Sequence, residues 1–257
     1  MLMATLFQKV YGSFSPKAFE PLFRSLCRGL RVRLEVVGKT DHGWIKIEVS
    51  GEDESAALNL LGREMGLAPT SIDKLKKSSA VTGRVFSSGQ SEDGLCVDVG
   101  VLSPQTCDAV IRLKSLQAQL ADGKKLSLLQ LTELFCFCDN MPVSVKVVGD
   151  IDIEGKHVEA ELSEAYLSQI TRWARSNLDR LIVLGAPLAK VEHAITASKH
   201  ARDIIRIEPL GLLEHAVLCK LGTDAKGILP KLGSLLSDAT LEPFSSRKIR
   251  GLIGSLV

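Results

Sequence analysis

The sequence predicts an α+β, multidomain protein with three parts. Three observations support this prediction: the chain has 257 residues, helix-like and strand-like segments are mixed at both ends, and short alternating strands lie between them. We expect a small βαββα sandwich over residues 1–66, a central β-barrel with a helical insertion over residues 67–149, and a C-terminal α+β domain over residues 150–257.

The first part carries the signals of five elements. Ser15-Pro16 is a helix start with proline in the first turn, and the polar run at residues 38–43 is a hairpin loop. Charged residues at 31, 33 and 35 alternate with apolar residues, so one sheet face packs on helices. The expected strands are residues 5–11, 30–37 and 44–50, and the expected helices are residues 15–29 and 53–65.

The central part begins with two alternating strands around Gly83 and Gly94, joined by a polar turn that contains glycine. A small OB-type barrel begins in this way. Arg84 and Phe86 alternate with Gly83 and Val85, so we expect Arg84 and Phe86 on the outer face. Further strands are expected near residues 109–113 and 143–147, and the helical spacing of residues 114–140 is broken at residues 121–123.

The C-terminal part mixes strands and helices with short connections, which favours helices packed on one face of a small sheet. The expected strands are residues 157–162, 180–184, 203–208 and 214–221, and the expected helices are residues 163–178, 187–200, 226–236 and 245–256.

The composition limits the possible functions. Lys and Arg number 32 against 30 acidic residues, so any nucleic-acid site must be a local patch, and an aromatic content of 5% limits base stacking. The first ten residues do not resemble a signal peptide, and no apolar run approaches the ~20 residues that span a bilayer. The six cysteines lack zinc spacing and are interpreted as reduced cytosolic thiols.

A set of cations with one aromatic residue forms the candidate nucleic-acid site. On the outer barrel face they would neutralise phosphates while Phe86 stacks on a base. The alternative is an ordinary solvated sheet face, and Asp98 on that face would oppose a polyanion. The candidate residues are Lys74, Lys76, Lys77, Arg84, Phe86, Arg112, Lys114, Lys124, Lys125 and Lys146.

A second candidate is the turn at residues 221–227, where a strand leads into a helix. Thr223 or Asp224 can cap the helix, and the helix start with Lys226 can bind an anion or dock a partner, although no complete phosphate-binding motif is present. No catalytic group, metal site or cofactor is predicted, because the histidines and the pair Cys136 and Cys138 lack suitable partners.

Two resemblances add to this interpretation. The segment from Gly83 through Gly94–Gly100 resembles the opening of S1-type RNA-binding domains, except that Leu95 and Cys96 stand where an aromatic residue is common. The chain as a whole is similar to an uncharacterised family of archaeal proteins, on the basis of residues 94–100, 134–142 and 202–225. This similarity implies a cytoplasmic, archaeal context.

We therefore expect a non-enzymatic, RNA-associated protein that binds RNA or a ribonucleoprotein through an S1/OB-like barrel, in transcription or translation. The alternative is a protein-interaction scaffold that docks on RNA polymerase or a ribosomal subunit without reading RNA. A small-molecule sensor or enzyme that uses the 222–227 turn is the third class. Binding that weakens with salt separates the first class from the second.

Overall fold

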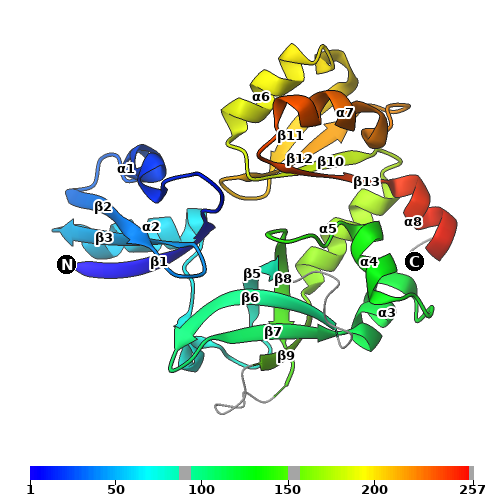
Figure 1. Cartoon of the computed structure of the whole chain (residues 1–257). Helices are drawn as coiled ribbons and strands as arrows, with labels where there is room; N and C mark the ends of the chain where they lie inside the picture. The colour runs from blue at the N-terminus through cyan, green and yellow to red at the C-terminus, as the bar shows by residue number, and fades with distance from the viewer. Residues whose placement is uncertain (87–93, 150–156, 255–257) are drawn as a thin grey trace. The chain divides into compact units, whose positions relative to one another are not determined.

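The computed structural model describes residues 1–86, 94–149 and 157–254, and these form a mixed α+β protein (Figure 1). The chain divides into two compact units, which are described separately. The first contains residues 1–75 and 99–107, and the second contains residues 76–98 and 108–257. Among the described residues, no helix has the length and apolar character needed to cross a membrane. The turn expected after residue 86 lies outside the described residues.

The N-terminal unit has the expected βαββα order. A short 3-10 turn at Pro16–Phe19 leads into α1, so the helix expected at residues 15–29 is shorter and divided. The sheet is antiparallel with β3 in its centre, and α1 and α2 cover one face with Phe23 and Leu61 in the core. The elements are β1 (Leu2–Lys9), α1 (Glu20–Leu26), β2 (Val32–Lys39), β3 (Trp44–Gly51) and α2 (Glu54–Met65).

The central sheet closes into a barrel of five strands. β5 pairs with β6 and β8, β9 pairs with β8 and runs parallel to β7, and the pairing of β6 with β7 completes the ring. The short strand β4 (Thr70–Ser71) pairs with the end of β6. The barrel strands are β5 (Ala80–Phe86), β6 (Gly94–Ser103), β7 (Cys107–Arg112), β8 (Pro142–Val147) and β9 (His157–Leu162).

Two helices lie between β7 and β8, as the interrupted helical pattern predicts. The first is followed by its C-cap residue Asp122, which is left-handed at φ 51°, and Ser127 caps the start of the second with a reciprocal capping box to Gln130. Apolar side chains alternate along β8, where Val143, Val145 and Val147 are buried. The helices are α3 (Leu113–Ala121) and α4 (Leu128–Phe135).

The strand at residues 157–162 belongs to a different sheet from the one we expected. We predicted that it would open the C-terminal α+β domain, but β9 pairs with β7 and β8 of the barrel. The helix after it, α5 (Glu164–Arg175), is capped by Ser163 and contacts β8. Strand pairing depends on distant residues, so the local pattern predicted the strand without predicting its sheet.

The remaining residues form a four-stranded antiparallel sheet in the order β11-β12-β10-β13. Side chains of α6 and α7 pack on one face of β10 and β12 around Val183 and Val217. Strand β13 was not expected, because its sequence Thr-Leu-Glu-Pro-Phe lacks a clear alternation. The elements are β10 (Arg180–Leu184), α6 (Leu188–Ala197), β11 (Ile204–Pro209), β12 (Glu214–Cys219), α7 (Ala225–Leu235), β13 (Thr240–Phe244) and α8 (Ser246–Ile253).

Candidate nucleic-acid interface

Arg84 does not lie on an open barrel face, so that expectation was wrong. Its side chain is only 1% exposed, and its Nη2 donates to Oε2 of Glu214 at 3.3 Å. Glu214 begins β12 and is fully buried, as is Asp98, which lies opposite Arg84 in the β5–β6 register. Residues of the C-terminal sheet therefore cover β5 here, and Arg84 is a buried structural cation.

The other barrel cations face carboxylates on β9. Arg112 is exposed and forms an ion pair with Glu159, while Lys146 is half-buried and lies opposite Glu161 in the strand register. Phe86 is half-buried at the end of β5. Because the local pattern places β9 in another domain, these acidic neighbours could not be predicted from the sequence. The outer barrel face alternates in charge and does not form a basic stripe.

Apart from Lys146, the lysines expected at the interface are all exposed, but they come from different segments. Lys74 belongs to the N-terminal unit, whereas the turn between α3 and α4 brings Lys124 to α8, where its Nζ donates to the carbonyl of Leu252 at 3.2 Å. These exposed lysines are Lys74, Lys76, Lys77, Lys114, Lys124 and Lys125.

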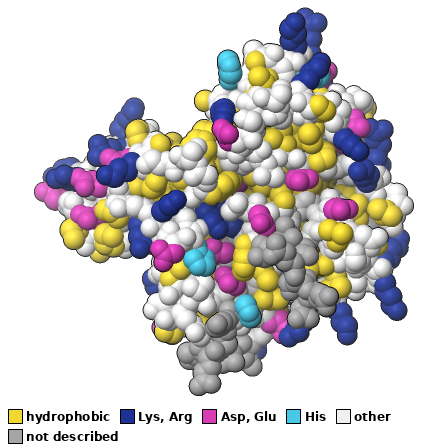
Figure 2. All heavy atoms as spheres, in the orientation of Figure 1, with side chains coloured by type: hydrophobic (Ala, Val, Ile, Leu, Met, Phe, Trp, Pro, Cys, Tyr) yellow, Lys and Arg dark blue, Asp and Glu magenta, His cyan; other side chains and the backbone are white. Residues whose placement is uncertain are grey.

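Helix α8 presents three exposed cations on one side. Ile249 and Ser246 are fully buried, while Arg247, Lys248 and Arg250 point to solvent. None of these three cations forms an ion pair with a described residue. We call Lys124, Lys226, Arg247, Lys248 and Arg250 the α8 surface. Figure 2 shows Lys and Arg side chains gathered over the region where Figure 1 labels α8 and α3.

The sequence predicted a helix at residues 245–256 but did not predict the α8 surface as a candidate site. Its cations come from α8, α7 and the α3–α4 turn, which are far apart along the chain. Sequence spacing therefore gave no reason to group them.

Two neighbouring pockets lie beside these cations, and Asp179 and Arg247 line both of them. One has a volume of about 430 Å³ and the other a volume of about 270 Å³. Both are lined by the turn that precedes α7 and by the start of α8. The larger is lined by Asn177, Asp179, Leu221, Gly222, Thr223, Arg247 and Arg250, and the smaller by Asp179, Asp224, Lys226, Pro243, Ser245, Arg247 and Lys248.

Asp179 is a buried carboxylate in this cationic region. It is 3% exposed, and its Oδ1 accepts a hydrogen bond from Ser246 Oγ at 3.5 Å. Its Oδ2 has no hydrogen-bond partner among the described residues. Burial, with Asp179 as the next contribution, raises the pKa of the nearby Cys219 thiol to about 12. This thiol therefore stays protonated at neutral pH and is a poor nucleophile.

The 221–227 turn has the local structure that its sequence predicts. Asp224 is the cap of α7, because its Oδ1 accepts from the backbone N–H of Lys226 at 2.9 Å. Thr223 provides no cap and lines the larger pocket instead. The sequence left the choice of cap open, and the structure assigns it to Asp224.

Replacing Asp224 with alanine is expected to lower the free energy of unfolding by about 1 kcal/mol, because the start of α7 loses its cap. Urea denaturation of this variant measures the loss. Thr223→Ala is the matched control and is expected to leave the free energy of unfolding nearly unchanged. An equal loss in both variants would contradict the assignment of the cap.

Other titratable groups are held in uncharged forms. Burial, followed by Glu242, raises the pKa of Cys138 to about 12. Burial also lowers the pKa of His215, whose Nε2 donates to the carbonyl of Ala186 at 2.9 Å.

Among the described residues, no three His, Cys, Asp or Glu side chains are placed to hold a metal ion. The arrangement is suited to ionic and hydrogen-bonded contacts with a ligand.

Comparison with known proteins identifies three consecutive domains of one family. The DUF2110 N-terminal domain matches residues 3–71, the DUF2110 central domain matches residues 76–174, and the DUF2110 C-terminal domain matches residues 178–242. No curated protein matches the chain. The central match includes β9 and α5, in agreement with the pairing of β9 in the barrel. Since the three matches cover most of the sequence, the chain belongs to the DUF2110 family.

Proposed function

We propose that this protein is a non-enzymatic, RNA-associated protein that binds the phosphate backbone of RNA with the α8 surface. The observation that carries the proposal is the convergence of cations from three separate elements beside two pockets. Arg247, Lys248 and Arg250 have no competing ion pair with a described residue. Arginine side chains in such positions are well suited to contact phosphate oxygens.

The barrel supports the choice of RNA as the ligand. Around the ring its strands follow the order β6, β5, β8, β9 and β7, and α3 and α4 lie between the third and fourth strands along the chain, as in an OB-type barrel. We extend this interpretation to the S1 type of barrel. Such barrels commonly hold single-stranded nucleic acid.

Contacts to phosphates are expected to dominate over contacts to bases. Phe86 is half-buried, and no described aromatic residue lines the pockets of the α8 surface. Without a stacking platform, the free energy of binding comes mainly from neutralised phosphates and depends weakly on sequence. A role in transcription or translation and a place in the cytoplasm are part of this proposal. The six free thiols agree with a reducing compartment.

The test is a fluorescence anisotropy titration of a mixed-sequence, single-stranded RNA at several salt concentrations. We expect the double variant Arg247→Ala with Arg250→Ala to bind about tenfold or more weakly at low salt. If both side chains contact phosphates, the slope of log affinity against log salt should become shallower by roughly 1.4.

The matched control removes two cations from the barrel face, through Arg112→Ala with Lys146→Ala. These side chains already face Glu159 and Glu161, so a small change in affinity is expected. Equal losses in the two double variants would mean that only the net charge of the protein matters. Full affinity in the folded α8 variant would refute the proposed surface.

A protein-interaction scaffold is the second candidate function. The observation that favours it is the alternating charge of the barrel face, where Arg112 pairs with Glu159. Such a face is suited to a partner with its own mixed charges, such as RNA polymerase or a ribosomal subunit. Partner binding together with no measurable RNA binding, even at low salt, would favour this candidate over RNA binding.

A further inference from the structure

The outer edge of β1 in the N-terminal unit is only partly covered. The segment after α2 pairs with the middle of the strand: Phe7 N–H donates to the carbonyl of Gly66 at 3.1 Å, and Ala68 N–H donates to the carbonyl of Thr5 at 2.9 Å. Backbone groups alternate in direction along a strand, so those of Met3 point to the same side as those of Thr5 and Phe7. No described residue forms a backbone hydrogen bond with Met3 on that side.

The opposite edge of the same sheet, on β2, is closed by side chains of α1. Glu20 Oε2 accepts a hydrogen bond from Val36 N–H at 2.9 Å, and Arg24 Nε donates to the carbonyl of Leu34 at 3.1 Å. Glu20 and Arg24 are also joined by an ion pair at 2.6 Å. The fold therefore blocks one sheet edge and leaves the first part of the other open, which is the geometry that accepts an added strand.

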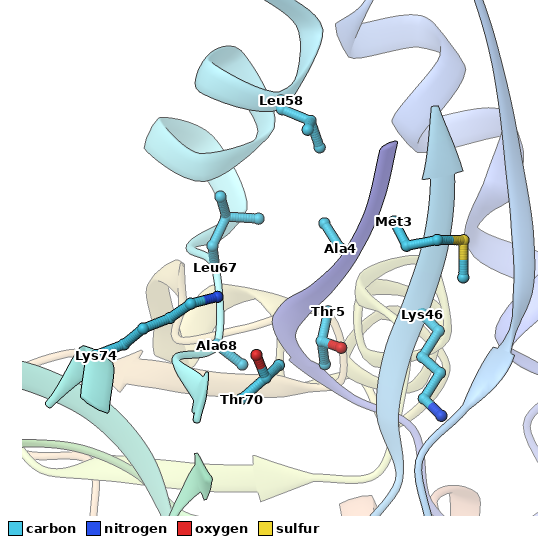
Figure 3. Close-up of a pocket in the computed structure, with 9 residues that line it drawn as sticks. All are labelled: Met3, Ala4, Thr5, Lys46, Leu58, Leu67, Ala68, Thr70 and Lys74. Carbon is cyan, nitrogen blue, oxygen red and sulfur yellow. The ribbon is translucent and has the colours of Figure 1, made fainter. Parts of the chain in front are cut away.

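A pocket of about 380 Å³ lies at this open edge and is lined from both faces of the sheet. Ala4 shares the helix-covered face with Leu58 of α2 and with Leu67, whereas Thr5 pairs in register with Lys46 and shares the opposite face. Figure 3 shows these side chains on both sides of the β1 ribbon. An extended chain laid along β1 would send alternate side chains to an apolar side and to a lysine side.

The charge at the pocket selects the kind of chain that fits. Lys46 and Lys74 both line the pocket, and neither forms an ion pair with a described residue. Figure 3 shows the amine end of Lys74 beside Leu67. Acidic side chains on the incoming strand would neutralise these amines. A second copy of this protein, paired through its own β1, would instead bring its own Lys46 and Lys74 toward them. Like charges at close range are unfavourable.

We propose that the open edge of β1 binds an extended acidic segment of a partner protein by strand addition. The segment pairs with the backbone of Met3, places small apolar side chains against Ala4 and Leu67, and places carboxylates near Lys46 and Lys74. This site belongs to the N-terminal unit and is independent of the proposed RNA surface.

The probe is a fluorescein-labelled, end-capped octapeptide in which valine and glutamate alternate, titrated into the full-length protein. We expect saturable binding that weakens about tenfold or more when Lys46→Glu is combined with Lys74→Glu. The peptide in which lysine replaces glutamate should show the reverse preference. The control K17E/K39E makes the same change in net charge on exposed lysines away from the pocket and should keep wild-type affinity.

A second variant tests strand pairing itself. Met3→Pro removes an N–H that points away from β3, so the sheet keeps its own hydrogen bonds while the added strand loses one. Peptide affinity should fall in this variant, with circular dichroism unchanged. If the folded charge-reversal variant or the folded Met3→Pro variant keeps full affinity, or the wild type shows no saturable binding, the proposal is overturned.

Two further measurements identify the occupant and separate this site from the RNA surface. Sedimentation of the wild-type protein as a dimer that the peptide dissociates would assign the edge to a second copy and overturn the acidic partner. The Arg247→Ala with Arg250→Ala variant should bind the peptide normally, so failure of the RNA proposal leaves this one standing.

Discussion

Replacing Arg84 with alanine is expected to lower the free energy of unfolding by about 3–5 kcal/mol. The guanidinium is buried and paired with Glu214 at 3.3 Å, and Glu214 is itself fully buried. Removing the cation takes a counter-charge away from a desolvated carboxylate, which is costlier than losing one exposed contact. Urea denaturation followed by circular dichroism measures the loss.

The control for this prediction is Arg112→Ala, which removes an exposed arginine that is paired with Glu159. An exposed ion pair contributes about 0–1 kcal/mol, so the free energy of unfolding should change little. If Arg84→Ala were as mild as Arg112→Ala, Arg84 would have to be accessible to solvent. That result would restore the outward orientation that the strand alternation predicted.

Replacing Gly94 with alanine is expected to lower the free energy of unfolding by about 1–3 kcal/mol. A Cβ atom at this position would lie 2.9 Å from the carbonyl carbon of Ile111 and within overlap of its oxygen. Gly94 starts β6 and Ile111 lies on β7, the pair of strands that completes the barrel. The backbone of one strand must therefore shift, which weakens the closure of the barrel.

Gly233→Ala provides the matched control for the same chemical change. Gly233 lies in α7, and beyond its chain neighbours and the nearby helix backbone no described atom lies within 4 Å of the position that a Cβ would take. Alanine favours helix over glycine, so this variant should gain up to about 1 kcal/mol of stability. Thermal melts of the two variants should therefore shift in opposite directions. A stable Gly94→Ala protein would show that β6 and β7 approach less closely than the structure indicates.

Several elements could be predicted from local sequence because their signals are local. Ser127 and Gln130 form a capping box at the start of α4, and Asp224 caps α7 within the turn that its sequence marks. The alternation of β8 likewise separates buried valines from the partly exposed Lys146. These features depend on residues no more than a few positions apart.

The candidate sites were less predictable because each depends on which segments meet. Arg84 was placed on the outer face of β5 by alternation, but alternation does not say what covers that face. The covering residue, Glu214, is 130 positions away in the chain. In the same way, Lys124 became part of a basic surface through α8, and this grouping has no signature in the local sequence.

The sequence by itself determined the mixed α+β class, the βαββα order of the N-terminal part and the helices between the third and fourth barrel strands. Backbone propensities, caps and side-chain periodicity act over short distances, so they can be interpreted from one segment at a time. Only the tertiary structure decided that β9 joins the barrel, that Arg84 is buried against Glu214 and that the cations of α7, α8 and the α3–α4 turn lie together. The pairing of distant strands and the desolvation of charges arise when remote segments pack, and the free energy of that packing belongs to no single segment.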